Sequence, residues 1–332
     1  MLFIAALIGA LLAGPAALGT PTARDRAVPR YDHIIVIVEE NTGYRTIADR
    51  GWAPNLTKLA RQYGSATRMY AETHPSEGNY VALLGGDTFG IRDDDPHVIE
   101  GPSLATELRA KHLGWRAYLE DIPERGSLAI ASPGTATAPP GLYAAKHTGF
   151  TNFAPVRRDT DLAHELVGFD VLDADLRAGR VPAFALVVPN QCNDMHGIGA
   201  RTAPADCAGS DEALVRRGDA HAADLVAAIQ SSSLWMAPNV TTAIVITWDE
   251  DGKAFPDTPG SCCVQDAHNP GGGHIPTIVI ANHGPRGVVD PTPYDHYSLL
   301  RTIEDALRLG AHLRHAGDAS VLPMTPLFAV SP

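Results

Sequence analysis

The chain has 332 residues, 45% of them hydrophobic, with a formal net charge of −12 and a pI near 5.5. This length accommodates one large domain or two smaller ones, with ample apolar residues for a core. The acidic balance argues against nucleic acid as the main partner, because binding to backbone phosphates requires a basic face. It does not exclude a small phosphorylated substrate, since a bound cation reverses the field inside a site.

The N-terminal segment has the composition of an export signal. Residues 2–18 are apolar or small throughout, and Ala17-Leu18-Gly19 places small residues at the two positions that signal peptidase reads. We therefore expect a signal peptide over residues 1–23, cleaved between about residue 19 and residue 23, and a secreted, periplasmic or cell-surface protein. An uncleaved membrane anchor is the alternative, although the apolar run is short for a full span.

The remaining chain alternates strand and helix patterns. Runs such as HIIVIVE at 33–39 are typical of strands buried on both faces, whereas YSLLRTIEDALRL at 297–309 has the spacing of an amphipathic helix. In chain order, the predicted elements are strand 33–39, helix 54–64, helix 104–112, strand 115–119, strand 183–188, helix 218–231, strand 242–247, strand 276–281 and helix 297–309. Loops rich in Gly, Pro, Asp and Ser are predicted at 92–101, 131–141 and 251–273. This alternation predicts an α/β layered fold with a largely parallel central sheet flanked by helices, in a single domain over residues 30–330.

Polar residues follow three of the predicted strands. Glu40 and Asn41 come after the first strand, residues 190–196 after another, and Asp249 and Glu250 after a third. In open α/β sheets, ligands bind beyond the carboxyl ends of the strands. Each motif alone is also typical of a turn or a solvated loop, but their coincidence at several strand ends indicates a site.

Ser76 is the candidate nucleophile. It follows Pro75 and precedes an apolar segment, which places it near a helix N-terminus, where backbone N–H groups favour a bound phosphate. The alternative is an ordinary serine N-cap with Glu77 in the first helical turn, and the two roles are compatible. No base lies nearby in sequence, so we expect activation by a metal.

Histidines and cysteines supply further candidates. Four of the 14 histidines lie in loops or at element starts, where contact with phosphate or a metal is plausible, and His147 is a possible fifth; the four are His74, His196, His274 and His296. Cys192 and Cys207 flank a loop rich in Gly, Ala, Asp and Pro and are a plausible disulfide. Cys262 and Cys263 are adjacent, so a bond between them would be strained, and four cysteines allow three pairings. A cysteine zinc site is disfavoured, because no C-x2-C spacing is present.

At these residues the chain resembles a family of secreted phosphoesterases, which contains bacterial phospholipases C and acid phosphatases and belongs to the alkaline-phosphatase-like superfamily. The similar segments occur in the family's order and span most of the chain: HIIVIVEEN (33–41), HPSEGNY (74–80), WRAY (115–118) with Glu120, VPNQCNDMH (188–196), GD (218–219), TWDED (247–251), HIP (274–276) and YDHYSLLRTIE (294–304). Gly78 departs from the family, which usually has Pro there, and this would loosen the turn that carries Ser76. The long C-terminal extension of the larger phospholipases C is missing, which favours the smaller phosphatase-like members.

The resemblance implies roles for individual residues. Ser76 matches the nucleophile, and the implied metal ligands are Glu40, Asn41, Asp249 and Glu250. Asn79 matches a residue that contacts phosphate, and His74 is expected to bind substrate. The remaining matches would line the phosphate pocket or hold a second cation: Asp194, His196, His274 and His296. The three histidines of that set would stabilise charge on the phosphoryl group or protonate the leaving alcohol.

The predicted function is therefore a secreted, metal-dependent phosphomonoesterase with a serine nucleophile. The divalent cation is Ca, Mg, Mn or Zn, and the expected partner is a small phosphorylated substrate, with no nucleic-acid or protein partner. A phospholipase C-type phosphodiesterase, which would also have to meet a membrane, is the first alternative. A non-catalytic exported protein that binds phosphate or a cation is the second. A sulfatase is disfavoured, because its Cys/Ser-x-Pro-x-Arg motif is absent around Ser76.

Overall fold

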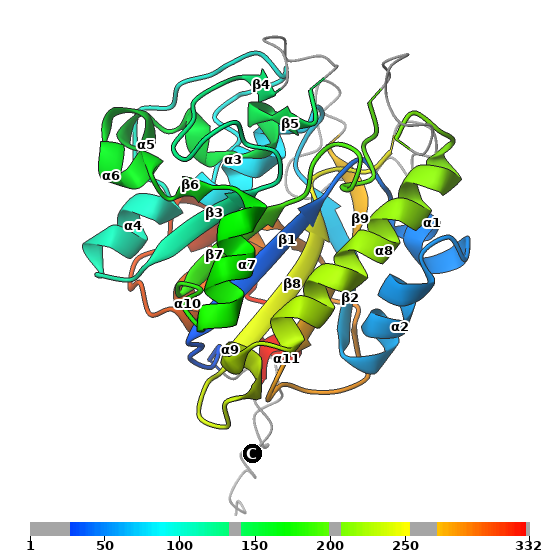
Figure 1. The fold of residues 1–332 in the computed structure, drawn as a ribbon. Coiled ribbons are helices and arrows are strands. Elements are labelled where there is room, and N and C mark those ends of the chain that lie inside the picture. The colour runs from blue at the N-terminus through cyan, green and yellow to red at the C-terminus, as the bar shows by residue number, and fades with distance from the viewer. Residues whose placement is uncertain (1–26, 133–140, 199–206, 253–270, 330–332) are drawn as a thin grey trace, which may run out of the picture.

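The computed structural model describes residues 27–132, 141–198, 207–252 and 271–329 (Figure 1). Its centre is a nine-stranded sheet in the order β10-β2-β9-β8-β1-β7-β3-β6, with β11 also paired to β2. Helices cover both faces, with α2, α7 and α8 on the face nearer the viewer in Figure 1 and α3 and α10 on the other. Across the described ranges, no helix combines the length and the apolar character that a membrane span needs.

The strands of the sheet are β1 (His33–Glu39), β2 (Gly64–Ala71), β3 (Trp115–Leu119), β6 (Leu166–Val167), β7 (Phe184–Val188), β8 (Thr242–Trp248), β9 (Gly273–Ala281), β10 (Val288–Asp290) and β11 (Tyr294–Asp295). A separate two-stranded sheet joins β4 (Ala131–Ser132) to β5 (Tyr143–Ala144). β1, β7 and β8 are parallel and buried, as their continuous apolar sequences require. β9 runs antiparallel to β8 and β2, so its first residues lie at the edge where the parallel strands end.

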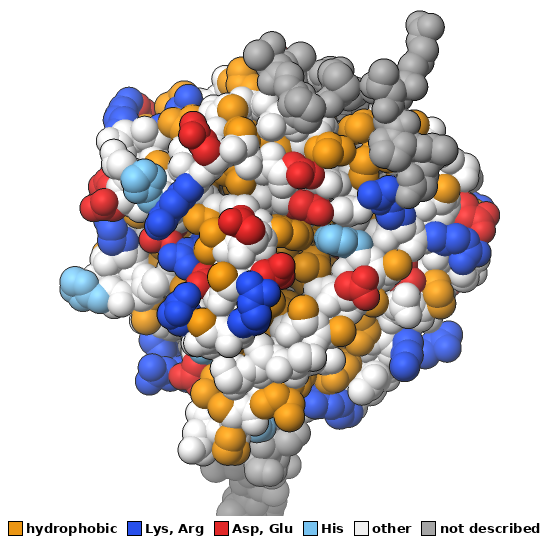
Figure 2. All heavy atoms as spheres, viewed as in Figure 1, with side chains coloured by type: hydrophobic (Ala, Val, Ile, Leu, Met, Phe, Trp, Pro, Cys, Tyr) orange, Lys and Arg blue, Asp and Glu red, His pale blue; other side chains and the backbone are white. Residues whose placement is uncertain are grey.

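The helices are α1 (Tyr44–Asp49), α2 (Pro54–Gln62), α3 (Glu77–Gly85), α4 (Leu104–Ala110), α5 (Ala154–Arg158), α6 (Thr160–Ala163), α7 (Phe169–Ala178), α8 (Asp211–Gln230), α9 (Ser233–Met236), α10 (His296–Ala306) and α11 (Thr325–Phe328). Figure 2 shows acidic and basic side chains interspersed on the face formed by α2, α7 and α8, with no broad patch of one sign.

The predicted fold class is confirmed: the sheet is mostly parallel and helices flank it. Several predicted boundaries differ by one to three residues, and two starts differ by three residues or more. α8 begins at Asp211 rather than Gly218, because the Ser210 side chain caps the helix by accepting a hydrogen bond from the Ala213 N–H. β9 begins at Gly273 rather than Pro276, because its first residues pair with β2, a strand that the sequence did not predict.

Candidate active site

The candidate site forms where β1, β7 and β8 end. Glu39 and Trp248 are paired in register, so Glu40 and Asp249 emerge side by side. The Asp249 N–H donates to the Glu39 carbonyl (3.1 Å), and the Glu40 N–H donates to the carbonyl of Asp194 (2.7 Å). Three segments that are far apart in sequence are therefore held together by backbone hydrogen bonds directly beneath the site.

Asn41 links the two late carboxylates. Its backbone N–H donates to Asp249 Oδ1 (3.1 Å), and its side-chain Nδ2 donates to Glu250 Oε1 (2.6 Å). The residue has a φ of 45°, in the left-handed region that Asn tolerates better than most residues. The structure thus places the four predicted metal ligands next to one another, while their coordination of an ion stays a prediction.

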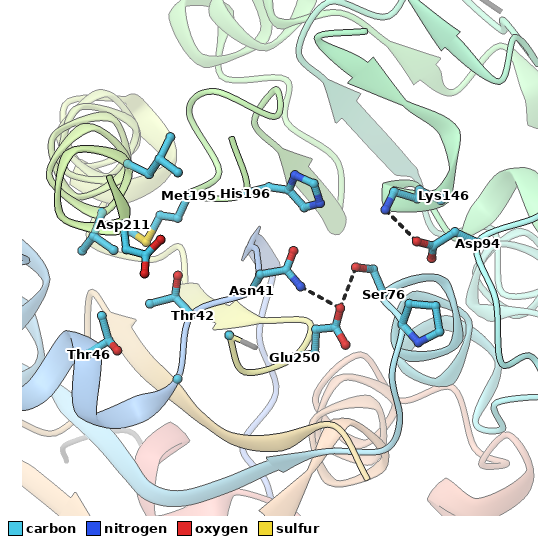
Figure 3. A pocket seen from close by; sticks show the side chains of 15 residues that line it. Asn41, Thr42, Thr46, Ser76, Asp94, Lys146, Met195, His196, Asp211 and Glu250 are labelled. Carbon is cyan, nitrogen blue, oxygen red and sulfur yellow. Dashed lines mark hydrogen bonds and ion pairs between the residues drawn. The ribbon is translucent and has the colours of Figure 1, made fainter. Parts of the chain in front are cut away.

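Ser76 lies immediately before α3 with its hydroxyl directed at two carboxylates. Its Oγ donates to Glu250 Oε1 (3.0 Å) and Glu40 Oε2 (3.2 Å), and it makes no capping bond to its own helix (Figure 3). The alternative role of a serine N-cap is therefore not what this side chain performs. A hydroxyl between two carboxylates at the N-terminus of a helix is well placed to lose its proton.

The turn before Ser76 is shaped by Asn79 and Gly78. Asn79 Oδ1 accepts from the N–H groups of Glu72 and Thr73 (both 3.0 Å), and its Nδ2 donates to the Thr73 carbonyl (2.8 Å). The structure gives Asn79 a role in this turn, while its contact with phosphate stays a prediction. Gly78 lies within α3, and a Cβ there would meet Thr73 Cγ2 at 2.5 Å. The expectation of a loosened turn is wrong, because Gly78 allows a close approach instead.

His74 contacts two acidic residues that follow β8, Glu250 and Asp251. Its Nδ1 bonds to Glu250, and its Nε2 lies 3.4 Å from Asp251 Oδ1. Burial alone would lower the pKa of His74, but hydrogen bonds to Asp251 and Glu250 outweigh it and raise the pKa to about 10. His74 is therefore a cation at neutral pH that partly neutralises these two carboxylates.

Glu40 also belongs to a second group of possible metal ligands, together with two histidines. Glu40, His147 and His196 each offer one atom, and these atoms all lie within 4.8 Å of one another. His147 Nε2 is 3.4 Å from Glu40 Oε1, and its Nδ1 is 3.7 Å from Asp194 Oδ2. His147 Nε2 and Asp194 Oδ2 are buried and have no hydrogen-bond partner among the residues described. A buried imidazole nitrogen without a hydrogen-bond partner, close to a carboxylate and to a second histidine, is the arrangement expected of ligands for a cation.

Burial shifts the pKa values of all three groups toward their neutral forms. Burial raises the pKa of Glu40 well above its usual range, and the charges of Asp249 and Asp194 add to the effect. Burial lowers the pKa of His147 well below its usual range and also lowers that of His196, so both imidazoles are neutral. His196 Nδ1 lies 2.6 Å from the Gly197 carbonyl and must donate to it, which leaves Nε2 with a free lone pair.

Two predicted histidines are not part of the cavity. His274 lies between the rings of Tyr44 and Tyr70, with centroid distances of 4.4 and 5.1 Å, and its Nε2 is 2.9 Å from the Thr67 carbonyl. His296 has Nδ1 2.5 Å from a Glu72 oxygen and Nε2 2.9 Å from the Trp248 carbonyl. With both ring nitrogens facing acceptors, His296 supports the end of β8. Direct contact of either histidine with a phosphoryl group stays a prediction without support from this geometry.

A cavity of about 280 Å³ opens above Ser76. Figure 3 shows Asn41, Ser76 and Glu250 at its centre, Lys146 and Asp94 at one end, and Thr42, Thr46 and Asp211 at the other. Lys146 Nζ donates to Asp94 Oδ2 (2.8 Å). Burial opposes a raised pKa for Lys146, but the negative charges of Glu40 and Asp94 outweigh it, so the amine is a cation. Neither Lys146 nor Asp94 belongs to a recognisable local motif, so the sequence pattern did not predict a role for either residue.

A disulfide joins Cys192 to Cys207, the pair that the sequence predicted, with a Cα–Cα distance of 4.7 Å. It connects the segment after β7 to the start of α8, and the Ile198 N–H donates to the Cys207 carbonyl across the closed loop (3.0 Å). This connection fixes the segment that carries Asp194 and His196. Cys262 and Cys263 lie outside the described residues.

Proteins of similar sequence show the family to which the chain belongs. The model of the Phosphoesterase family matches residues 48–310, and the chain belongs to this family of hydrolases acting on phosphoric ester bonds. The chain is 30% identical over 280 residues to phosphatidylinositol-3-phosphatase of Mycobacterium tuberculosis. The matched region covers 84% of this chain and 77% of that relative. The chain is 27% identical over 278 residues to the phosphate-repressible acid phosphatase of Penicillium chrysogenum, covering 82% of this chain but only 58% of that longer protein.

Solved structures share the fold at much lower sequence identity. A protein of the alkaline phosphatase superfamily from Vibrio parahaemolyticus has a TM-score of 0.55 at 13% identity, covering 90% of this chain and 74% of that one. The phosphonate monoester hydrolase of Silicibacter pomeroyi has a TM-score of 0.52 at 17% identity, covering 91% and 77%. At such identities the likeness shows the architecture alone.

Proposed function

We propose that the protein is a cation-dependent phosphomonoesterase in which Ser76 is the nucleophile. The observation that carries this proposal is the Ser76 hydroxyl, which lies at the start of α3 and bonds to Glu40 and Glu250 instead of capping its helix. A purely binding protein would not need a hydroxyl held between two carboxylates at the centre of its cavity.

The reaction proceeds in two displacements. In the first, a bond forms between Ser76 Oγ and phosphorus while the bond to the leaving oxygen breaks. The Ser76 proton passes to the Glu250 carboxylate, 3.0 Å away, and then to the leaving alkoxide, which departs as an alcohol. In the second, water attacks phosphorus while the bond between phosphorus and Ser76 Oγ breaks. One proton of that water passes through Glu250 to Ser76 Oγ, and inorganic phosphate leaves. Lys146 neutralises charge on the phosphoryl oxygens at its end of the cavity.

A divalent cation fits the residues present. Glu40, His147 and His196 would hold it, with Asp194 and Asp249 nearby, because one ligand atom of each lies within 4.8 Å of the others and His147 Nε2 has no hydrogen-bond partner among the described residues. A bound cation supplies charge neutralisation and promotes ionisation of a neighbouring hydroxyl. Two imidazoles with a carboxylate favour a transition-metal ion such as Zn or Mn, whereas the Asn41, Asp249 and Glu250 oxygens favour Mg or Ca.

Phosphate monoesters are the proposed substrate class. The relatives reported above are named as phosphatases, and Lys146 lines the same cavity as Ser76, where it can neutralise the second negative charge that a monoester carries. A phospholipase C-type diesterase is the runner-up. The Cys192–Cys207 disulfide supports an oxidising, exported location, in line with the signal peptide predicted for residues 1–23, which lie outside the described ranges.

The test is trapping of the covalent intermediate. Acid-quenched enzyme that has been incubated with a radiolabelled monoester should carry label on Ser76, and Ser76→Ala should lose both the label and several orders of magnitude in kcat. Ser232→Ala, which changes a buried serine before α9, is the matched control and should retain both. Normal turnover by Ser76→Ala would overturn the nucleophile. A higher kcat/KM for p-nitrophenylphosphorylcholine than for p-nitrophenyl phosphate would favour the diesterase instead.

A further inference from the structure

The end of the cavity opposite Lys146 has its own chemistry. Thr42 and Thr46 contribute hydroxyl groups, and Asp211, the first residue of α8, contributes a carboxylate. In Figure 3, Asp211 and Thr42 both appear on the far side of Glu250 from Lys146, and both line the cavity. The phosphoryl group must lie near Ser76 and Lys146, so this far end receives the leaving group.

The polar groups at this end are available to a ligand. Thr42 Oγ1 donates to the Glu40 carbonyl (3.0 Å), which leaves its oxygen free to accept. Among the residues described, no hydrogen bond or ion pair engages the Asp211 carboxylate or the Thr46 hydroxyl. A carboxylate with two hydroxyl groups can satisfy several hydroxyls of one ligand at once.

An apolar wall faces these groups. Met195, Leu214 and Val215 line the same end of the cavity. Met195 is held in place, because a Cβ at Gly218 would lie only 2.4 Å from its Cγ. A rigid apolar wall opposite hydrogen-bonding groups matches a polyhydroxylated ring or chain, whose C–H face packs while its hydroxyl groups bond.

The charge at this end opposes a second phosphate. The N-terminus of the 20-residue α8 would attract an anion, but Asp211 and Glu212 occupy its first turn. Among the described residues that line the cavity, Lys146 is the only Lys or Arg, and it lies at the other end. An anionic leaving group would therefore meet the Asp211 carboxylate with no Lys or Arg among the described lining residues at that end to balance it.

We propose that Thr42, Thr46 and Asp211 form a subsite for a polyhydroxylated leaving group, so that the enzyme prefers polyol monophosphates and rejects a second phosphate. This inference rests on the proposed phosphomonoesterase function. Asp211 binds hydroxyl groups of the substrate as a specificity-determining residue and takes no part in bond breaking.

The test compares kcat/KM for inositol monophosphate, inositol bisphosphate and p-nitrophenyl phosphate in the wild type, Asp211→Asn and Glu212→Gln. Asp211→Asn should lower the ratio of kcat/KM for inositol monophosphate to kcat/KM for p-nitrophenyl phosphate about tenfold, because the neutral amide accepts weaker hydrogen bonds from hydroxyl groups than the carboxylate does. It should also raise the ratio of bisphosphate to monophosphate. Glu212→Gln removes the same charge one residue away, where the side chain pairs with Arg216 instead, and should leave both ratios unchanged.

Three outcomes decide the matter. Equal effects of the two substitutions would overturn the inference, since a general change of charge would explain both. A wild type that hydrolyses p-nitrophenyl phosphate but shows no preference for the polyol monoester over the bisphosphate would overturn the inference alone. Hydrolysis of no monoester at all, with the cation supplied, would overturn the proposed function.

Discussion

Replacing Gly78 by Ala tests whether close packing beneath α3 positions the nucleophile. The added Cβ would lie 2.5 Å from Thr73 Cγ2 and 3.2 Å from the Ile91 carbonyl oxygen. Ala normally stabilises a helix relative to Gly by about 1 kcal/mol. Overpacking in a filled site costs about 1–3 kcal/mol, so the steric effect should win and the variant should be less stable.

The consequence for activity follows from what Thr73 holds. Its backbone N–H bonds to Asn79, so a displaced Thr73 shifts the turn that leads to Ser76. Misplacement of a reacting group by about 1 Å costs up to about a hundredfold in rate, and a shift of a few tenths should lower kcat about tenfold. The assays are kcat and KM for p-nitrophenyl phosphate, together with urea unfolding to measure the change in stability.

A second substitution makes the test sharper. Thr73→Ser removes the methyl group that the added Cβ would strike but keeps the hydroxyl, which donates to the His74 carbonyl (3.1 Å). The double variant Thr73→Ser/Gly78→Ala should therefore regain most of the lost kcat. Full activity in Gly78→Ala, or no recovery in the double variant, would refute the steric argument.

Three further predictions concern stability. Burial raises the pKa of Glu304 from 4.5 to about 8, so the folded state holds this proton more tightly than the unfolded state. The free energy of unfolding should therefore fall, by at most about 1.4 kcal/mol per pH unit, as the pH rises between these two values. Urea unfolding at the two pH limits should show a smaller fall for Glu304→Gln. Asp219 accepts from the N–H groups of Asn55 and Leu56 at the start of α2, and Asp219→Ala should cost about 1–2 kcal/mol by the same assay, a neutral result contradicting the capping role. Cys192→Ser/Cys207→Ser opens a link across 15 residues and should cost about 2–4 kcal/mol, whereas an unchanged Tm under oxidising conditions would mean that the link is dispensable.

The sequence predicted the central strands well because their burial leaves a local mark. β1 and β8 have continuous runs of β-branched residues that only a strand covered on both faces accommodates. β2 has the sequence GSATRMYA, in which an arginine and small polar residues hide the pattern. Its strand conformation depends on pairing with β9, a contact between distant segments that no local pattern records.

In the candidate site, the sequence predicted the positions of residues along the chain better than the directions of their side chains. Residues that directly follow a strand, such as Glu40 and Asp249, could be located because the strand determines where they emerge. Side-chain direction is a different matter: His274 and His296 lie at the correct edge of the sheet, yet aromatic rings enclose one and Glu72 engages the other. His147 reaches Glu40 from a short 3₁₀ turn whose position depends on the packing of distant segments, so its sequence context gave only a faint signal.

The balance of charge around Ser76 yields a final prediction, that cation and phosphate bind cooperatively. Glu40, Asp194, Asp249 and Glu250 are all buried there, and burial with the charge of Glu250 raises the pKa of Asp249 to about 7. The nearby cation Lys146 already pairs with Asp94, so a phosphate dianion would enter a region that is acidic overall.

A bound divalent cation reverses this balance, and thermodynamic linkage requires that phosphate then tightens cation binding by the same factor. Calorimetric titration of inorganic phosphate should show weak or no binding to chelator-treated protein, and binding at least about tenfold tighter once one suitable cation is restored. His147→Ala should lose most of this coupling, because it removes a ligand on the side of Glu40 away from Glu250, while His315→Ala, an exposed histidine paired with Asp318, should retain it. Equal phosphate affinity with and without every cation tested would show that protons alone neutralise the buried carboxylates. The proposal that a cation binds at this site would then be refuted.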